Sequence, residues 1–129
     1  MRIEHIAIWV RDLEKVRMFY ETYFEATSSS KYHNKTKDFQ SYFLSFRDGC
    51  RLELMHRSDI ADGFLNHEQQ TFGIIHFAMS VGSRERVDQL TLLLRADGHR
   101  VIGEPRITGD GYYESVVLDP EGNIVEITI

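Results

Sequence analysis

Cysteine, blocks of like charge and long apolar runs are all scarce in this sequence of 129 residues. The single cysteine, Cys50, excludes an intrachain disulfide and suits a reducing cytoplasm. The net charge is −5 without a block of one sign, so we expect neither nucleic acid nor an anionic membrane as a partner. No apolar run approaches membrane-spanning length, and the N-terminus has no features of a signal peptide. We therefore expect one compact cytoplasmic domain.

Two segments of the chain carry nearly the same pattern. Residues 5–10 (HIAIWV) and 76–81 (HFAMSV) both read His, apolar, Ala, apolar, any residue, Val. Each segment is followed about fifty residues later by a glutamate inside a strand pattern, Glu53 and Glu126. This repeat, about half as long as the chain, predicts two similar modules, each with one histidine and one glutamate at equivalent places.

The first half, residues 1–68, has the pattern of a βαβββ module that we call module one. Its expected elements are a strand at 5–10, a helix capped by Asp12 that runs to about Phe24, a strand near 26–32, a strand at 40–47, and a strand at 51–55 after the Asp48-Gly49 turn.

The second half, residues 69–129, repeats this plan and is called module two. Residues 57–72 are polar and contain glycine, which predicts a linker between the modules. The expected elements are a strand at 76–81, a helix capped by Ser83 with Val87, Leu90, Leu93 and Leu94 and closed by Gly98, and strands at 100–102, 113–118 and 123–129, the last after the turn at 119–122.

Side-chain alternation along the strands sorts the repeated polar residues onto one kind of face. In the first strand the apolar positions suit packing on the helix, so His5 and Trp9 point to the opposite face. The same alternation places Glu53, His76 and Glu126 on the faces that point away from the helices. The small alanines two residues after each histidine leave room for a cavity there.

Two imidazoles and two carboxylates that converge from such faces predict a metal site. A carboxylate there is costly unless it is paired, protonated or bound to a metal. The set suits a divalent Zn, Ni, Co, Mn or Fe ion, and an ion with open positions can bind a substrate oxygen. A metal-held carbonyl acidifies the adjacent C–H, and a loosely bound glutamate can take that proton. The alternative is a degenerate repeat whose polar residues pair by hydrogen bonds.

Two further residues share these faces. Trp9 lies on the face of His5 and is predicted to form a wall of the substrate pocket, with plain core packing as the alternative. Arg51 lies on the face of Glu53, where it either neutralises a substrate anion or forms an ion pair with a nearby acid.

The sequence resembles glyoxalase I-like members of the vicinal-oxygen-chelate (glyoxalase/bleomycin resistance/dioxygenase) superfamily over nearly its whole length. The resemblance rests on HIAI at 5–8, RLEL at 51–54, HFAM at 76–79 and, most specifically, DPEGNIVEI at 119–127. It implies an α+β fold with two tandem βαβββ modules that form a cupped mixed sheet around one metal, with helices on the convex face. It also implies a homodimer in which modules of two chains complete each site.

In this family the ligand positions match His5, Glu53, His76 and Glu126. The resemblance implies that Glu126, with Glu53 as the second catalytic carboxylate, transfers the proton. The metal is Ni or Co in many bacterial forms and Zn in others. The implied reaction isomerises the hemithioacetal of a thiol and methylglyoxal to a thioester. A His–His–Glu triad, typical of fosfomycin-modifying members and extradiol dioxygenases, is not present, because the second ligand here is a glutamate.

Two positions depart from glyoxalases I that use glutathione. These enzymes have an arginine four residues after the first ligand histidine, where this chain has Trp9, and an asparagine four residues after the first ligand glutamate, where it has Arg57. We therefore predict a metal-dependent lyase or isomerase acting on a small oxo substrate. Another metal-dependent reaction of the superfamily, such as epimerisation, and a non-enzymatic small-molecule binding or sequestering protein are the alternatives.

Overall fold

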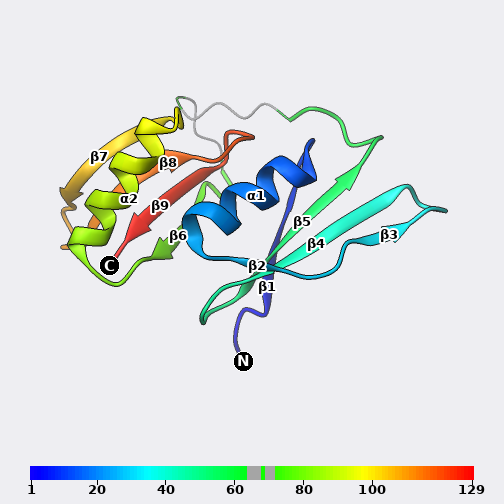
Figure 1. Ribbon diagram of the computed structural model, residues 1–129, viewed down its shortest axis with the longest axis horizontal. Helices are drawn as coiled ribbons and strands as arrows, with labels where there is room; N and C mark the ends of the chain where they lie inside the picture. Colours follow the sequence, from blue (N-terminus) through cyan, green and yellow to red (C-terminus); the bar gives the residue numbers. More distant parts are fainter. Residues whose placement is uncertain (64–67, 69–71) are drawn as a thin grey trace. The chain divides into compact units, whose positions relative to one another are not determined.

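The computed structural model describes residues 1–63, 68 and 72–129. Its contacts divide the chain into two compact units, residues 1–63 and 64–129, and from here on module one and module two denote these two units. In each module one helix covers one mixed sheet (Figure 1). The expected α+β fold with two tandem βαβββ modules is confirmed, and hydrogen bonding gives each module its own sheet. In the described ranges neither helix has the length and apolar character needed to cross a membrane.

Module one forms a sheet in the order β1-β5-β4-β2, with β3 paired to β4. The pair β1 and β5 is parallel and the others are antiparallel. The strand expected near 26–32 is split, and beside the gap the Ser29 hydroxyl accepts a hydrogen bond from the backbone N–H of Phe43 at 3.1 Å. The elements are β1 His5–Trp9, α1 Leu13–Phe24, β2 Thr27–Ser28, β3 Tyr32–Asn34, β4 Phe39–Ser45 and β5 Arg51–Arg57.

Helix α1 begins and ends where the sequence predicts. The Asp12 carboxylate accepts a hydrogen bond from the backbone N–H of Lys15 at 3.0 Å, which satisfies a donor that the first turn leaves free. The helix ends at Phe24 because Glu25 adopts a left-handed conformation with φ of 56°. Its apolar face is buried: Leu13, Val16, Phe19, Tyr20 and Phe24.

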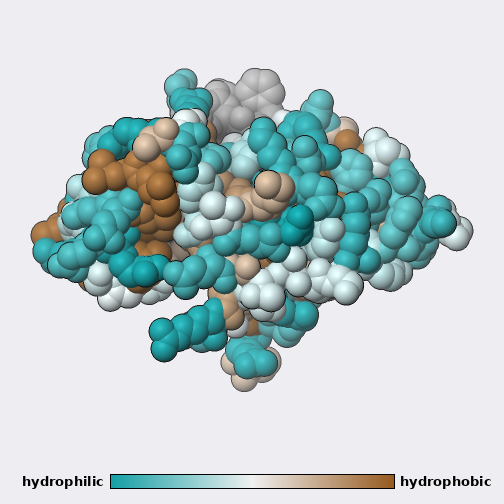
Figure 2. Space-filling view, viewed as in Figure 1, coloured by the Kyte–Doolittle hydropathy of each residue, from teal (hydrophilic) through white to brown (hydrophobic). Residues whose placement is uncertain are grey.

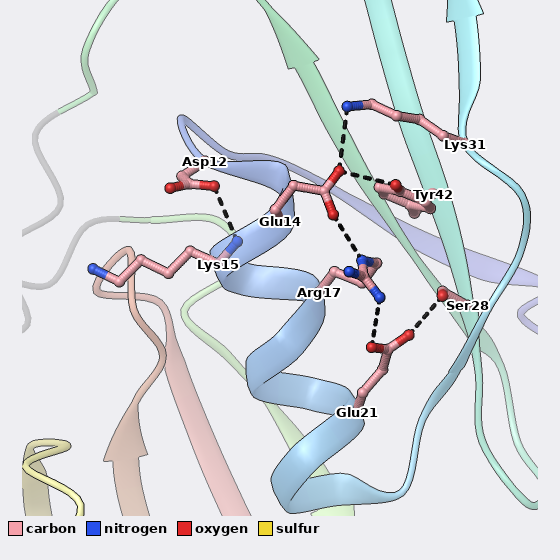
Figure 3. Close-up of polar contacts among 8 residues, drawn as sticks. All are labelled: Asp12, Glu14, Lys15, Arg17, Glu21, Ser28, Lys31 and Tyr42. Carbon is pink, nitrogen blue, oxygen red and sulfur yellow. Dashed lines mark hydrogen bonds and ion pairs between the residues drawn. The ribbon is translucent and has the colours of Figure 1, made fainter.

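A polar network fastens α1 to the neighbouring strands (Figure 3). Arg17 donates to Glu14 at 3.0 Å and to Glu21 at 2.6 Å. The hydroxyls of Tyr42 and Ser28 donate to these same carboxylates, at 2.9 and 2.6 Å respectively. The hydrogen bond from Ser28, followed by the bond from Arg17, holds the pKa of Glu21 below its ordinary value. The helix is therefore fixed by polar contacts along one side and by apolar packing along the other.

Module two forms a sheet in the order β6-β9-β8-β7, again with one parallel pair, β6 and β9. The hydroxyl of Ser83 caps the helix by accepting from the N–H of Arg86 at 3.3 Å, as expected. The strand expected at 100–102 is longer, and its register with β8 shifts around Gly103. The elements are β6 His76–Ser80, α2 Arg84–Ala96, β7 Val101–Ile107, β8 Tyr113–Leu118 and β9 Ile124–Thr128.

The buried face of α2 differs from the expected one. Val87 and Leu94 are buried, but Leu93 is 49% exposed, so its expected place on the apolar face was wrong. Thr91 completes the buried face with Val87 and Leu94, because its hydroxyl donates to the carbonyl of Val87 and shares a hydrogen bond with Ser115, both at 2.6 Å. Figure 2 accordingly shows apolar surface over α2.

The boundary between the modules is described only in part. The linker expected at 57–72 includes residues 64–67 and 69–71, which lie outside the described residues. Its first residue, Arg57, is the last residue of β5. A single domain with modules that meet at residue 68 stays a prediction.

Candidate functional site

In module one, His5 and Glu53 lie together on the parallel strands β1 and β5. Glu53 is opposite Ala7, which shares the face of His5 because it is two residues further along β1. The Nε2 atom of His5 is 3.8 Å from Oε2 of Glu53. Leu52 and Leu54 are buried on the opposite face, where α1 packs. The predicted alternation is therefore confirmed, and we call the face that carries the His–Glu pair the site face.

Module two repeats this arrangement on β6 and β9. Glu126 is opposite Ala78, and the Nε2 atom of His76 is 3.3 Å from Oε2 of Glu126. The side chain of Glu126 is only 19% exposed, while that of His76 is 40% exposed. Val125 and Ile127, on either side of Glu126, are completely buried. The backbone on both sides of this glutamate is thus fixed by the core.

A second acid orients the histidine of module one. Glu4 Oε2 is 2.5 Å from Nδ1 of His5, which leaves Nε2 directed toward Glu53. Arg51 pairs with the other oxygen of Glu4. The hydrogen bond from His5 is the main cause that holds the pKa of Glu4 below its ordinary value, and Arg51 adds to it. A carboxylate on the outer nitrogen is one of the usual partners of a metal-bound histidine, beside a backbone carbonyl or a water.

Arg51 has one of the two roles that the sequence allowed. Its ion pair with Glu4 is formed, and its guanidinium also lies 4.2 Å from the centre of the Phe43 ring. A contact with a substrate anion stays a prediction. The role of Glu4 was missed by the sequence analysis, although an acid directly before the ligand histidine was a signal that could have found it.

Trp9 lies at the end of β1 with 41% of its surface exposed, which argues against plain core packing. Its ring meets Phe39 edge to face at 6.1 Å, and the guanidinium of Arg57 lies 5.7 Å from its centre. It points to the site face, like His5. A wall of a substrate pocket at Trp9 stays a prediction.

Module two has a buried acid that the sequence analysis missed. Glu114 on β8 is 8% exposed and lies on the site face, two residues before Val116, which is opposite Glu126. Burial is the main cause that raises the pKa of Glu114, and the charge of Glu126 raises it further. Arg106 Nη2 is 3.3 Å from Oε1 of Glu114. The signal in the sequence was an acid that shares the alternate positions of its strand with the apolar residues Val116 and Leu118.

The separation of the donor atoms in module two fits a divalent metal. Two ligands bonded to one ion at about 2.1 Å lie roughly 3.0 to 3.4 Å apart for octahedral to tetrahedral angles. The separation of 3.3 Å between His76 and Glu126 lies in this range, and that of 3.8 Å between His5 and Glu53 is slightly longer. Imidazole with carboxylate is a suitable set for Zn, Ni, Co, Mn or Fe(II).

The part of the chain that the structure describes contains no group of three or more His, Cys, Asp or Glu side chains placed to hold a metal. Each module by itself brings together two of the four expected ligands. A single site that combines the four stays a prediction.

Comparison with known proteins assigns the family. Residues 2–127 match the Glyoxalase/Bleomycin resistance protein/Dioxygenase superfamily, so the chain belongs to this superfamily. The chain is 28% identical over 130 residues to the uncharacterized protein YqjT of Bacillus subtilis (strain 168), a match that covers 97% of this chain and 96% of that protein.

Solved structures of glyoxalase I share the fold. A glyoxalase I mutant from Zea mays matches 98% of this chain with a TM-score of 0.80 and 21% identity. The match covers 44% of the maize chain, which is thus more than twice as long as the part matched. The trypanothione-dependent glyoxalase I of Leishmania major matches 99% of this chain and 86% of its own, with a TM-score of 0.77 and 21% identity.

Proposed function

We propose that this protein is a metal-dependent lyase or isomerase of glyoxalase I type. It removes a proton next to a metal-chelated carbonyl of a small oxo substrate, such as the hemithioacetal of a thiol and an α-oxoaldehyde. The observation that supports this proposal is the repeated His–Glu pair, with His76 Nε2 3.3 Å from Glu126 Oε2 and His5 Nε2 3.8 Å from Glu53 Oε2.

In the proposed mechanism the residues that would hold one divalent ion (Ni, Co, Zn, Mn or Fe) are His5, Glu53, His76 and Glu126. When bound, such an ion polarises the substrate carbonyl and acidifies the adjacent C–H. The carboxylate of Glu126 would take the proton from the carbon that bears the sulfur and return it to the former carbonyl carbon, while the hydroxyl proton passes to the former carbonyl oxygen, so that a hemithioacetal becomes a thioester. Its strand neighbours are completely buried, so the carboxylate is positioned by a rigid backbone.

The proposal also covers the oligomeric state of the protein and its location in the cell. Each module supplies one histidine and one glutamate, so a complete site needs two modules, either of one chain or of two chains in a homodimer. A small molecule is the expected partner. The single cysteine and the net charge of −5 suit a cytoplasmic protein that binds neither nucleic acid nor membranes.

Metal content is the first test of this function. Purified untagged protein is expected to hold about one equivalent of a divalent metal per chain, and the His76→Ala variant to lose it, because the variant lacks one of the four ligands and Glu126 loses its partner. Elemental analysis measures both. His33→Ala, which removes an exposed histidine of β3, is the control and should keep the metal. Wild-type protein without metal even after reconstitution would rule out the lyase function.

A change at Glu4 tests the orientation of His5. The Glu4→Ala variant is expected to bind the metal at least about tenfold more weakly, because the acid that fixes the Nδ1 side of His5 is lost. Competition with a chromogenic chelator measures this affinity. Glu104→Ala removes an exposed carboxylate from β7 and is expected to have no effect. An unchanged affinity in Glu4→Ala would show that His5 needs no such partner.

A second candidate is another reaction at the same metal, such as epimerisation. It is favoured by Trp9 and Arg57, which stand where glyoxalases I that use glutathione have an arginine and an asparagine, and whose ring centre and guanidinium lie 5.7 Å apart on the site face. The similar enzyme from Leishmania major is described as trypanothione-dependent, so hemithioacetals of several thiols belong in a substrate panel beside acyl thioesters and hydroxy ketones. Ligand-induced stabilisation without turnover of any substrate would instead indicate a binding or sequestering protein.

A further inference from the structure

Module two carries an ion pair on its site face where module one has a small hydroxyl. Glu114 is opposite Thr128, which follows the ligand Glu126 by two residues. At the matching place in module one, Ser41 is opposite Met55, which follows Glu53 by two residues. The two modules therefore repeat the proposed metal ligands but not this acid. The two modules therefore differ in the residues that lie beside the proposed metal ligands.

Arg106, the partner of Glu114, lies over a glycine. Gly103 is opposite Val116, and Val116 is opposite Glu126, so the three residues form one row across β7, β8 and β9 on the site face. A Cβ atom on Gly103 would lie 3.2 Å from Nη1 of Arg106 and 2.9 Å from Cγ2 of Val116. The guanidinium therefore uses the space that the missing side chain leaves, in the row of Glu126.

The guanidinium retains donors for a ligand. Its contact with Glu114 is a single one, Nη2 to Oε1 at 3.3 Å, and the Arg106 side chain is 51% exposed. An arginine has five N–H donors in a planar fork. Glu114 thus holds Arg106 in place without using the whole fork.

We infer that Arg106 binds an anionic group of the substrate, a carboxylate or a phosphate, and that Glu114 and Gly103 position it. This inference rests on the proposed function of the same site. Two strand spacings separate β9 from β7, so the anionic group is expected about 10 Å from the backbone of Glu126. The fork of an arginine matches the oxygens of carboxylates and phosphates. The substrate is then an oxo compound whose far end carries a negative charge.

Hydroxamates test this without turnover, because their two vicinal oxygens chelate a metal. We would titrate metal-loaded protein by calorimetry with hexanohydroxamate, whose tail is uncharged, and adipic monohydroxamate, whose tail ends in a carboxylate. A third probe carries a phosphonate on a tail of similar length. The wild type is expected to bind a charged probe about tenfold or more tightly than the uncharged one. The better of the two charged probes identifies the anion.

Variants separate recognition from structure. Arg106→Gln is expected to bring the charged and uncharged probes within about twofold of each other, with the affinity for the uncharged probe unchanged. Gly103→Ala keeps the charge but displaces the guanidinium, so the preference should fall in this variant too. Arg106→Lys should retain part of the preference for the charged probes that Arg106→Gln loses. Arg95→Gln, on the helix side of module two, is the control and should keep the full preference.

The outcomes are distinguishable through the metal content of each sample. Equal affinities of metal-loaded wild type for charged and uncharged probes would overturn the inference and leave the proposed function standing. If Arg106→Gln still bound the charged probes more tightly than the uncharged one, the inference would also be overturned. Protein without metal would refute the proposed function, and the inference with it. A preference present in the wild type and Arg95→Gln and lost in Arg106→Gln would support the inference.

Discussion

Replacement of Glu126 by glutamine is expected to lower kcat by a factor of about 10³ or more, because general-base catalysis contributes roughly 10² to 10⁴. The amide has nearly the same size and can still offer an oxygen to a metal, but it cannot accept the substrate proton. The buried neighbours Val125 and Ile127 should keep the strand in place. Steady-state kinetics of the metal-loaded variant on a hemithioacetal, with circular dichroism and elemental analysis of the same sample, measure this effect.

Two further variants serve as controls for this prediction. Glu104→Gln changes an exposed carboxylate of module two and should leave kcat unchanged. Glu53→Gln should weaken metal binding, with a smaller loss of kcat once the metal is restored at high concentration. If Glu126→Gln kept more than a tenth of the wild-type kcat, Glu126 would not be the base. If Glu53→Gln alone abolished kcat at full metal loading, the roles of the two glutamates would be exchanged.

Truncation of the core residue after each glutamate is expected to destabilise the fold strongly. Leu54 and Ile127 occupy equivalent places in the two modules, and both are completely buried. Leu54→Ala and Ile127→Ala should each lower the free energy of unfolding by about 2–5 kcal/mol, the usual cost of such a cavity. Urea unfolding followed by circular dichroism measures this loss. Leu92→Ala, on the exposed surface of α2, should change it by less than about 0.5 kcal/mol.

The same pair of variants tests whether the modules unfold together. In a single cooperative domain, both changes shift one common transition to lower urea. If each module unfolds by itself, the curve acquires two steps and each variant moves only one of them. A loss below about 1 kcal/mol for both variants would show that the cores relax around the missing atoms.

Local rules and the internal repeat predicted most of the fold. Asp12 and Ser83 cap the two helices as expected, and strand alternation placed the four candidate ligands on the site faces. These features depend on neighbours in the sequence or on a period of two, which a single sequence displays. Leu93 was misplaced because the buried face of α2 includes Thr91, a polar residue whose hydroxyl pairs with that of Ser115 on β8.

The residues around the candidate ligands were harder to predict, because they depend on contacts between distant segments. The carboxylate of Glu4 is shared between its neighbour His5 and Arg51, which is brought close only by the parallel pairing of two strands. The position of the Arg106 guanidinium depends on a register shift in β7 and on the missing side chain of Gly103. Neither the shift nor the open space has a sequence pattern of its own.

The parallel pairing of the first and last strands has a consequence for how each module is made. His5 and Glu53 lie about fifty residues apart in the chain, and so do His76 and Glu126. Each pair meets only when the last strand of its module has added to the first, which is a slow, long-range contact. An unfinished chain thus offers separate donors and no chelating pair. A metal that bridges such a pair would bind the folded module in preference to its fragments and stabilise it by mass action.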